Sequence, residues 1–374
     1  MDRYPNTVTY DGKALLAMVA CADFDSALLK NLLGRAEALL DCERISVVDR
    51  KMRAASGNPH DYASQGPYWW PNPDTPDGLP YICKDGVTNP ASVEPIGYDK
   101  MTEAVHHLAL AALYFQDGRY AERAVKLLRV WHLDPETYMT PHMEYAQAIP
   151  GVCEGRGIGI IDLCTSYRLF NAVAILEYLG MIDGETLDGL KQWYVDYTDW
   201  LLTSEKGADE DNMYNNHGTW LDVQVAAAAT FTGRHALAQK ILSAAYIRRV
   251  AKHIEPGGVQ PYERARTRGI SYSLFNLDAL TLLGNMARRY GIAQPYWKED
   301  GDKGDLMRSA IDYIYPYAVD PASFPYTELC PDGTKKKMAH LLARAQHYYP
   351  GQGYAEKAAE IADDHAFWRL EPQA

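Results

Sequence analysis

Apolar residues recur every three or four positions through most of the chain, and this spacing predicts a succession of amphipathic helices. The expected helices are Phe24 to Leu40, Met101 to Phe115, Ala121 to Trp131, Ile160 to Leu179, Leu187 to Leu202, Trp220 to Thr232, Leu237 to His253, Tyr272 to Tyr290, Leu306 to Tyr317, Lys337 to Tyr348 and Ala355 to Trp368. No run of alternating apolar and polar residues indicates a strand. Turn signals such as Gly180, Gly233 and Gly291 leave short loops between neighbours. The pattern predicts an all-α fold of antiparallel helix pairs.

The helix pairs show no fixed sequence period, whereas the repeats of an open solenoid do. A closed ring of helix pairs is therefore the expected arrangement. A chain of 374 residues has room for two or three average domains, but a helical ring of this length also folds as one. We expect one domain over residues 1–374.

Residues 58–95 depart from the helical pattern and read NPHDYASQGPYWWPNPDTPDGLPYICKDGVTNPASVEP. A loop of this length inside a compact domain is uncommon, and it is usually functional or disordered. Tyr62, Tyr68, Trp69, Trp70 and Tyr81 make the segment too apolar for a solvated linker. We expect this aromatic loop to pack on the body of the protein and to form one wall of a cleft.

Charge and cysteine usage narrow the classes of partner. The net charge of -12 opposes approach to nucleic acid or to an anionic membrane, although a cleft lined by Arg and Lys can still bind an anion. The six cysteines show neither a CxxC pair nor zinc-type spacing, and we expect them to be buried small side chains. No apolar run approaches the ~20 residues of a membrane span, and no signal peptide is visible. We therefore expect either a cytoplasmic protein or one whose signal has been removed.

Two segments contain Asn, His and Arg residues that could form a catalytic or ligand-binding site. The first, residues 214–220, reads YNNHGTW and precedes a strongly helical run. A helix cap formed by Asn215 or Asn216 explains this segment about as well as a functional role does. The second, residues 260–272, places three Arg residues at alternate positions of an acidic protein. A carboxylated ligand would suit this patch, although a solvated Arg face paired with Glu is the commoner arrangement.

Two further segments contain possible ligand contacts. Tyr68, Trp69 and Trp70 could stack on sugar faces, although aromatic residues more often belong to a core. Arg156 lies on a turn between two glycines, but these glycines do not follow a strand and do not form a phosphate loop. The sequence also lacks the serine hydrolase elbow, the HExxH motif and the Walker A motif. A carboxylate pair for glycoside hydrolysis stays open, because 49 Asp and Glu residues offer many pairs.

Four of these segments together resemble the alginate lyase superfamily of helical polysaccharide lyases. They are PYWWPNPDTPDGLPYICKDGVTNP at 67–90, GRGIGIIDL at 155–163, NNHGTW at 215–220, and the E-x-x-R-x-x-x-x-x-Y pattern of Glu263, Arg266 and Tyr272. The resemblance implies an (α/α) barrel or incomplete toroid that forms a single catalytic domain. It also implies cleavage of an acidic, uronic-acid polysaccharide by β-elimination with no metal or cofactor, in the periplasm or outside the cell.

The resemblance also implies roles for individual residues. The implied catalytic residues are Tyr272, His217, Asn216 and Arg266, and the implied substrate-binding residues are Tyr68, Trp69, Trp70, Arg156, Asn215, Glu263, Arg268 and Tyr62. Two positions depart from the better-known members, which have Tyr-Trp after the Asn-His and a His after the catalytic Tyr. This chain has Gly218-Thr219-Trp220 and Ser273 instead. The departures leave mannuronan, mixed alginate and glucuronan open as substrates.

Elimination from a 4-linked uronate requires donors for the carboxylate, a base for the proton on C5 and an acid for the departing O4. We expect Asn216 and Arg266 to bind the carboxylate, where they stabilise the enolate-like transition state. A free Tyr has a pKa of ~10, so Tyr272 needs a cation such as Arg266 or Arg268 to act as base. His217 is either a helper or a second base. A helical-barrel glycoside hydrolase and a non-catalytic carbohydrate-binding protein are the alternatives.

Overall fold

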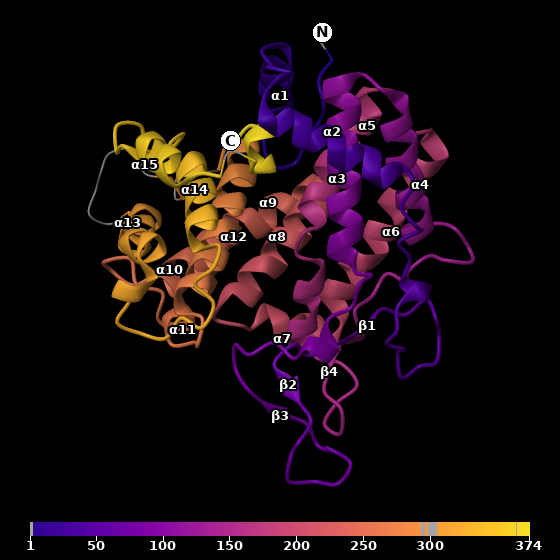
Figure 1. Cartoon of the computed structure of the whole chain (residues 1–374), viewed down its shortest axis with the longest axis vertical. Helices are drawn as coiled ribbons and strands as arrows, with labels where there is room; N and C mark the ends of the chain where they lie inside the picture. The colour runs from indigo at the N-terminus through magenta and orange to yellow at the C-terminus, as the bar shows by residue number, and fades with distance from the viewer. Residues whose placement is uncertain (1–2, 293–295, 298–304, 364) are drawn as a thin grey trace. The chain divides into compact units, whose positions relative to one another are not determined.

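The computed structural model describes residues 3–292, 296–297, 305–363 and 365–374 and consists mainly of helices (Figure 1). The chain forms two compact units. Unit 1 comprises Met1–Glu210 and Ala227–Gly233, and unit 2 comprises Asp211–Ala226 and Arg234–Ala374. The expected all-α class is confirmed by the helices of both units. The expectation of one domain over the whole chain stays a prediction.

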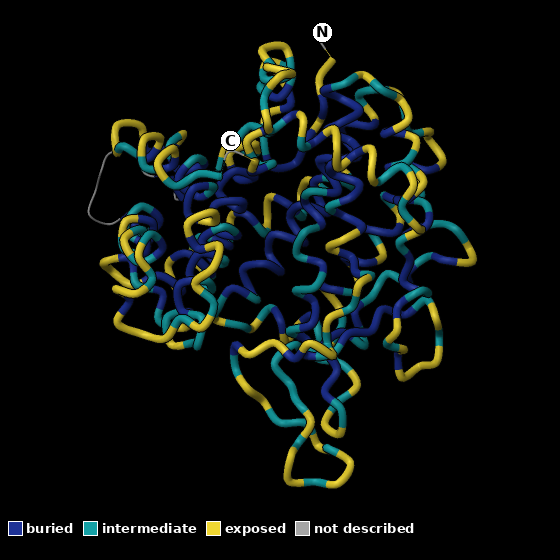
Figure 2. The backbone as a smooth tube through the Cα atoms, viewed as in Figure 1, coloured by how far each residue is buried: buried dark blue, intermediate teal, exposed yellow. Residues whose placement is uncertain are grey.

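Unit 1 is built from long helices around one largely buried helix, α3. Its helices are α1 (Gly12–Ala20), α2 (Ala27–Leu40), α3 (Tyr98–Phe115), α4 (Gly118–His132), α5 (Ser166–Tyr178), α6 (Gly184–Thr203) and most of α7 (Glu205–Asp211), with short 3-10 turns η1 (Val47–Asp49), η2 (Pro90–Ser92) and η3 (Gly157–Leu163). Helix α3 packs against α2, α4 and α5. It is apolar on nearly all sides, which is why most of its residues are buried (Figure 2).

Local sequence explains where several helices of unit 1 begin. Asp11, Ser26, Asp117 and Asp183 each precede a helix, and each side chain accepts a hydrogen bond from an amide of the first turn. The Asp183 carboxylate, for example, accepts from the Thr186 amide at 2.7 Å. Such caps satisfy donors that have no partner inside the helix. The helices therefore start where an acceptor side chain precedes an apolar run.

The aromatic loop of unit 1 contains short strands, which the sequence analysis did not expect. β1 (Ala63–Gln65) pairs in parallel with β4 (Tyr145–Ala148), and β2 (Trp69–Trp70) pairs antiparallel with β3 (Ile82–Cys83). The strands are too short to show an alternating pattern. They form because backbone groups of a packed loop need hydrogen-bond partners.

One stretch of unit 1, Gly157–Tyr178, is long and apolar enough to cross a membrane by length and composition. This corrects the expectation that no apolar run approaches a membrane span. The stretch joins η3 to α5, and 67% of its most apolar window is buried inside the fold. Core helices of soluble proteins have this character, so the stretch is weak support for membrane insertion.

Unit 2 holds the second group of helices, listed here in chain order. They are α8 (Asn216–Phe231, whose last residues belong to unit 1), α9 (His235–Ala245), η4 (Tyr246–Val250), α10 (Ala251–His253), α11 (Pro261–Arg264), α12 (Gly269–Arg289), α13 (Leu306–Val319), η5 (Pro321–Ser323), α14 (Thr334–Ala345), α15 (Tyr354–Ile361) and η6 (Phe367–Leu370). Helix α12 is largely buried and packs against α9, α11, α13 and α14. The η4 segment is a π-helix, which is a wider turn than an α-turn.

The predicted helices are all present, with differences at their ends. Helix α1 was not predicted, and the predicted helix Ala355 to Trp368 ends at Ile361 as α15, with residue 364 outside the described residues.

The expectation that the six cysteines are buried was wrong. Cys21 and Cys83 are exposed, and the other four are partly exposed. Cys21 follows the end of α1 and Cys83 lies in the aromatic loop, so neither reaches a core.

Candidate active site

The Asn-Asn-His segment of unit 2 lies at the start of helix α8. The Asn215 side chain accepts a hydrogen bond from the His217 amide at 3.2 Å, so Asn215 is a helix cap, as its simplest interpretation predicted. Asn216 is the first residue of α8 and is 1% exposed, whereas His217 is only partly buried. The cap therefore fixes both side chains on the first turn of a rigid helix.

Glu263 on α11 binds the same helix end. Its carboxylate accepts the Asn216 backbone amide at 2.5 Å and the Asn216 side-chain nitrogen at 2.9 and 3.1 Å. Glu263 is 1% exposed, and burial raises its pKa from 4.5 to about 7, while the Asn216 hydrogen bonds, His217 and Arg266 oppose this rise. Glu263 therefore holds Asn216 in place. The sequence predicted that Glu263 binds substrate. Glu263 would have to make that contact from its buried position, and the role stays a prediction.

A buried guanidinium explains the glycine after His217. Arg249 is 3% exposed, and a Cβ on Gly218 would lie 2.4 Å from its Nη1 and 2.5 Å from the Met213 carbonyl oxygen. Arg249 donates to the Met213 carbonyl oxygen at 3.2 Å and to the Asp222 carboxylate at 2.8 Å. Only glycine fits here without displacing these groups. The departure from Tyr-Trp at this position was the sequence signal that could have revealed Arg249.

His253 packs behind the same turn. Its Nδ1 lies 3.1 Å from the Thr219 hydroxyl, and the imidazole is 2% exposed. Burial, together with the nearby charge of Arg249, lowers its pKa from 6.5 to about 3. The imidazole is therefore neutral at ordinary pH and serves the packing of α8 rather than proton transfer.

Arg266 and Tyr272 meet beside this helix end. The Arg266 guanidinium carbon lies 4.5 Å from the centroid of the Tyr272 ring, and its Nη2 lies 3.4 Å from the Tyr272 hydroxyl. Arg266 follows α11 and Tyr272 lies on the first turn of α12, so the turn between these helices brings them together. A cation at this distance stabilises a phenolate relative to a phenol. The pairing expected from the sequence is thus present as a direct contact.

The other two Arg residues of the run have contacts of their own. Arg264 stacks over the Tyr326 ring at 4.7 Å. Arg268 precedes α12, and its backbone pairs with that of Glu328. The Glu328 carboxylate accepts from the Ser271 amide at 2.9 Å and so caps α12 one residue before Tyr272.

A polar network in unit 1 includes two of the predicted binding residues. Tyr62 is 4% exposed, and its hydroxyl donates to Asp162 at 3.2 Å. The Gln147 side chain donates to Asp162 at 2.9 Å, and Arg156 donates to the Gln147 backbone and side-chain oxygens, each at 3.0 Å. Gln147 has φ of 50°, a left-handed conformation that non-glycine residues rarely adopt outside constrained sites. Tyr62 supports the loop from inside, and the sequence analysis missed Gln147 and Asp162.

The aromatic loop itself is braced by hydrogen bonds. The Trp70 indole donates to the Val87 carbonyl oxygen at 2.9 Å, and Asn89 donates to the Trp69 carbonyl oxygen at 2.9 Å. Arg156 lies 5.9 Å from the Trp69 ring centroid. Tyr68, Trp69 and Trp70 are all partly exposed. They therefore keep surface on which a sugar could stack, on a backbone that is held in shape, and the stacking itself stays a prediction.

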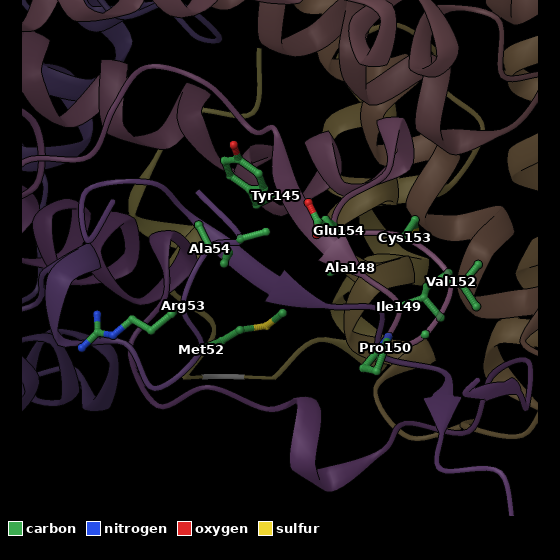
Figure 3. A pocket seen from close by; sticks show the side chains of 13 residues that line it. Met52, Arg53, Ala54, Tyr145, Ala148, Ile149, Pro150, Val152, Cys153 and Glu154 are labelled. Atoms are coloured by element: carbon green, nitrogen blue, oxygen red, sulfur yellow. The ribbon is translucent and has the colours of Figure 1, made fainter. Parts of the chain in front are cut away.

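Unit 1 also contains a pocket of about 420 Å³. Figure 3 shows its lining, which is Met52, Arg53, Ala54, Ala55, Ala63, Tyr145, Ala148, Ile149, Pro150, Gly151, Val152, Cys153 and Glu154. None of the predicted site residues lines it. Within the described part of the chain, no three His, Cys, Asp or Glu side chains are grouped to hold a metal ion.

Comparisons with known proteins agree with the resemblance in sequence. The alginate lyase family model matches residues 46–324. The crystal structure of an alginate lyase from Bacteroides ovatus is 35% identical, with a TM-score of 0.90 over 98% of each chain. No curated protein matches.

Two more distant structures share the fold. Alginate lyase A1-III from Sphingomonas species A1 is 15% identical, with a TM-score of 0.54 over 97% of this chain and 94% of that one. A His-to-Ala variant of alginate lyase A1-III, complexed with a tetrasaccharide, is 16% identical, with a TM-score of 0.57 over 95% and 100%. The expected (α/α) barrel class is confirmed by these structures. The chain belongs to the alginate lyase family, and it is a polysaccharide lyase.

Proposed function

We propose that this enzyme cleaves poly-mannuronate by β-elimination, with its chemistry carried by Asn216, His217, Arg266 and Tyr272 of unit 2. Two findings support an acidic polysaccharide substrate: the family of the chain, and the similarity to an alginate lyase at 35% identity. The observation that carries the proposal is the contact between the Arg266 guanidinium and the Tyr272 phenol.

The reaction breaks two bonds of one sugar and forms a double bond. A base removes the proton on C5, and the electron pair of the C5–H bond forms the C4=C5 double bond. The C4–O4 bond breaks as this double bond forms, and an acid protonates the departing O4. Tyr272 as phenolate takes the first proton and, as phenol, returns it to O4, so no external acid or base is consumed.

The carboxylate beside C5 must be bound before this proton can leave. Its charge opposes the further negative charge that develops in the transition state, so donors to the carboxylate lower the barrier. Arg266 offers a guanidinium fork that matches a carboxylate. Asn216 is held within 3.1 Å of both Glu263 oxygens, and an amide fixed in this way loses little freedom when substrate binds. His217, next on the same helix turn, contributes a further donor.

Stereochemistry favours mannuronate over guluronate for this arrangement. In mannuronate the C5 proton and O4 lie on the same face of the ring, so a single residue can serve both. In guluronate they lie on opposite faces, and His217 would have to act together with Tyr272. Glucuronate shares the same-face geometry, so glucuronan is the second candidate.

The decisive experiment replaces Tyr272 by Phe, which removes the hydroxyl and keeps the ring under Arg266. We expect kcat for formation of the ultraviolet-absorbing unsaturated product to fall by about 10²-fold or more, because the acid and base are lost. Tyr326→Phe is the matched control, since Tyr326 also lies under an arginine, at 4.7 Å from Arg264, and it should keep wild-type turnover.

Near wild-type turnover by Tyr272→Phe would refute the role of the phenol. The assay should compare poly-mannuronate, poly-guluronate and glucuronan as substrates. New reducing ends without ultraviolet absorbance would indicate a hydrolase, and polymer binding without any product would indicate a carbohydrate-binding protein.

A further inference from the structure

Two exposed tyrosines lie together in unit 2, immediately beside the residues that hold Asn216. Tyr214 is 58% exposed and Tyr262 is 54% exposed, and both are among the most exposed large hydrophobic side chains of the described residues. Their ring centroids are 6.1 Å apart and their planes differ by 26°. The two rings stack against one another and are both more than half exposed, so together they form one aromatic cluster on the surface, which we name the tyrosine pair.

The tyrosine pair is tied to the proposed active site by the backbone. Tyr214 lies two residues before Asn216, and Tyr262 lies one residue before Glu263. The hydrogen bonds from Asn216 to Glu263 at 2.5 to 3.1 Å therefore also bring the backbone at the two tyrosines together. A polymer that places one sugar at Asn216 passes close to this surface with a neighbouring sugar.

A cation accompanies the tyrosine pair. The Lys252 ammonium lies 5.9 Å from the centroid of the Tyr214 ring, and Lys252 is exposed. Pyranose rings present C–H groups on one face, and such faces pack on aromatic rings. A lysine ammonium binds a carboxylate more strongly than it binds a neutral hydroxyl. A uronate offers both features: an apolar ring face and a carboxylate at the ring edge. The ligand that fits this surface is a uronic-acid residue.

We infer that Tyr214, Tyr262 and Lys252 form a binding subsite for a uronate that flanks the one being cleaved, with the sugar stacked on the tyrosine pair and its carboxylate near Lys252. This inference rests on the proposed function for its substrate class. The three residues take no part in bond breaking. They raise affinity for polymer and leave the chemical step unchanged.

Binding and turnover test this inference separately. In the Tyr272→Phe background, the Kd for mannuronate oligosaccharides is measured by calorimetry, with and without Tyr214→Ala or Tyr262→Ala. Each alanine variant should weaken binding by between about twofold and tenfold, the range expected for loss of one aromatic contact. Tyr214→Phe and Tyr262→Phe should restore it, since stacking needs the ring and not the hydroxyl. Tyr4→Ala, which removes a 51% exposed tyrosine of unit 1, is the control for a change in surface area.

Steady-state kinetics of the otherwise native enzyme give the second readout. The alanine variants should raise KM for polymer and keep kcat at saturating substrate, whereas Lys252→Gln should also reduce the dependence of KM on salt. Unchanged Kd and KM in both alanine variants would overturn the subsite. Loss of kcat would overturn it as well, because that result would place the tyrosines in the chemistry. An active Tyr272→Phe enzyme would instead count against the proposed mechanism and leave the binding result to stand alone.

Discussion

Replacing Glu263 by Gln removes one buried charge and changes little else in shape. The carboxylate is 1% exposed, and its pKa rises from 4.5 to about 7 on folding. Each pH unit between these values corresponds to about 1.4 kcal/mol, so the ionised carboxylate costs the fold about 3 kcal/mol. Gln cannot ionise, and its oxygen can still accept a hydrogen bond from Asn216.

The direction of the pH effect follows from which state binds the proton more tightly. Below pH 4.5 Glu263 is protonated both folded and unfolded, and it has no effect on the pH dependence. As pH rises from 4.5 to about 7, the unfolded chain loses this proton first, so the free energy of unfolding of the wild type falls. Above this window the wild type should have lost about 3 kcal/mol relative to Glu263→Gln.

The measurement is a series of urea titrations across this pH range, followed by tryptophan fluorescence for both proteins. Only the difference between them is used, because His253, with its pKa lowered to about 3, contributes a change of opposite sign as pH falls below 6.5. Glu255→Gln, which alters an exposed carboxylate of the same unit, should follow the wild-type curve. A difference between wild type and Glu263→Gln that does not change with pH would refute the reasoning.

Two further substitutions test the packing behind α8. Gly218→Ala places a Cβ 2.4 Å from Arg249 Nη1 and should lower the free energy of unfolding by about 1–3 kcal/mol. Gly34→Ala on α2 is the control, because its Cβ meets nothing within 4 Å and the change should be neutral or stabilising. Thermal denaturation of both variants measures the difference. Asp222→Asn removes the buried charged partner of Arg249, which keeps its ion pair to the more exposed Asp211 at 2.9 Å, and should lower the free energy of unfolding by about 1–3 kcal/mol. Equal stability of the two glycine variants, or a wild-type Tm for Asp222→Asn, would contradict this packing.

The sequence predicted the helices because their signal is local. An apolar stripe and a capping residue lie within one stretch of chain, as in α6 with Asp183, so the order of residues is enough to find them. The contact between Arg266 and Tyr272 was predictable for the same reason, since the two residues are six positions apart. The short strands were not predictable, because β2 and β3 have only two residues each and β1 pairs with the distant segment β4.

The residues that hold the site in place could not be predicted from the sequence either, because their partners are distant along the chain. Glu263 meets Asn216 across 47 residues, and Arg249 meets Asp222 across 27 residues. A carboxylate or guanidinium that is buried by tertiary packing looks in sequence like any surface charge. Glu263 was therefore expected to bind substrate, and Arg249 was not considered. Gly218 carried the only local sign, since a glycine in place of a large residue indicates that something else fills the space.

The π-helix at Tyr246–Val250 has a consequence for how this chain is compared with its relatives. A π-turn closes hydrogen bonds from each residue to the fifth along, so it holds about one residue more than an α-turn. Arg249 lies inside this turn, and His253 follows it on α10. Where a relative has a regular α-helix at this place, an alignment without a gap slips by one position and matches both side chains to the wrong neighbours. The extra residue should be counted as part of the architecture when distant members of the family are aligned.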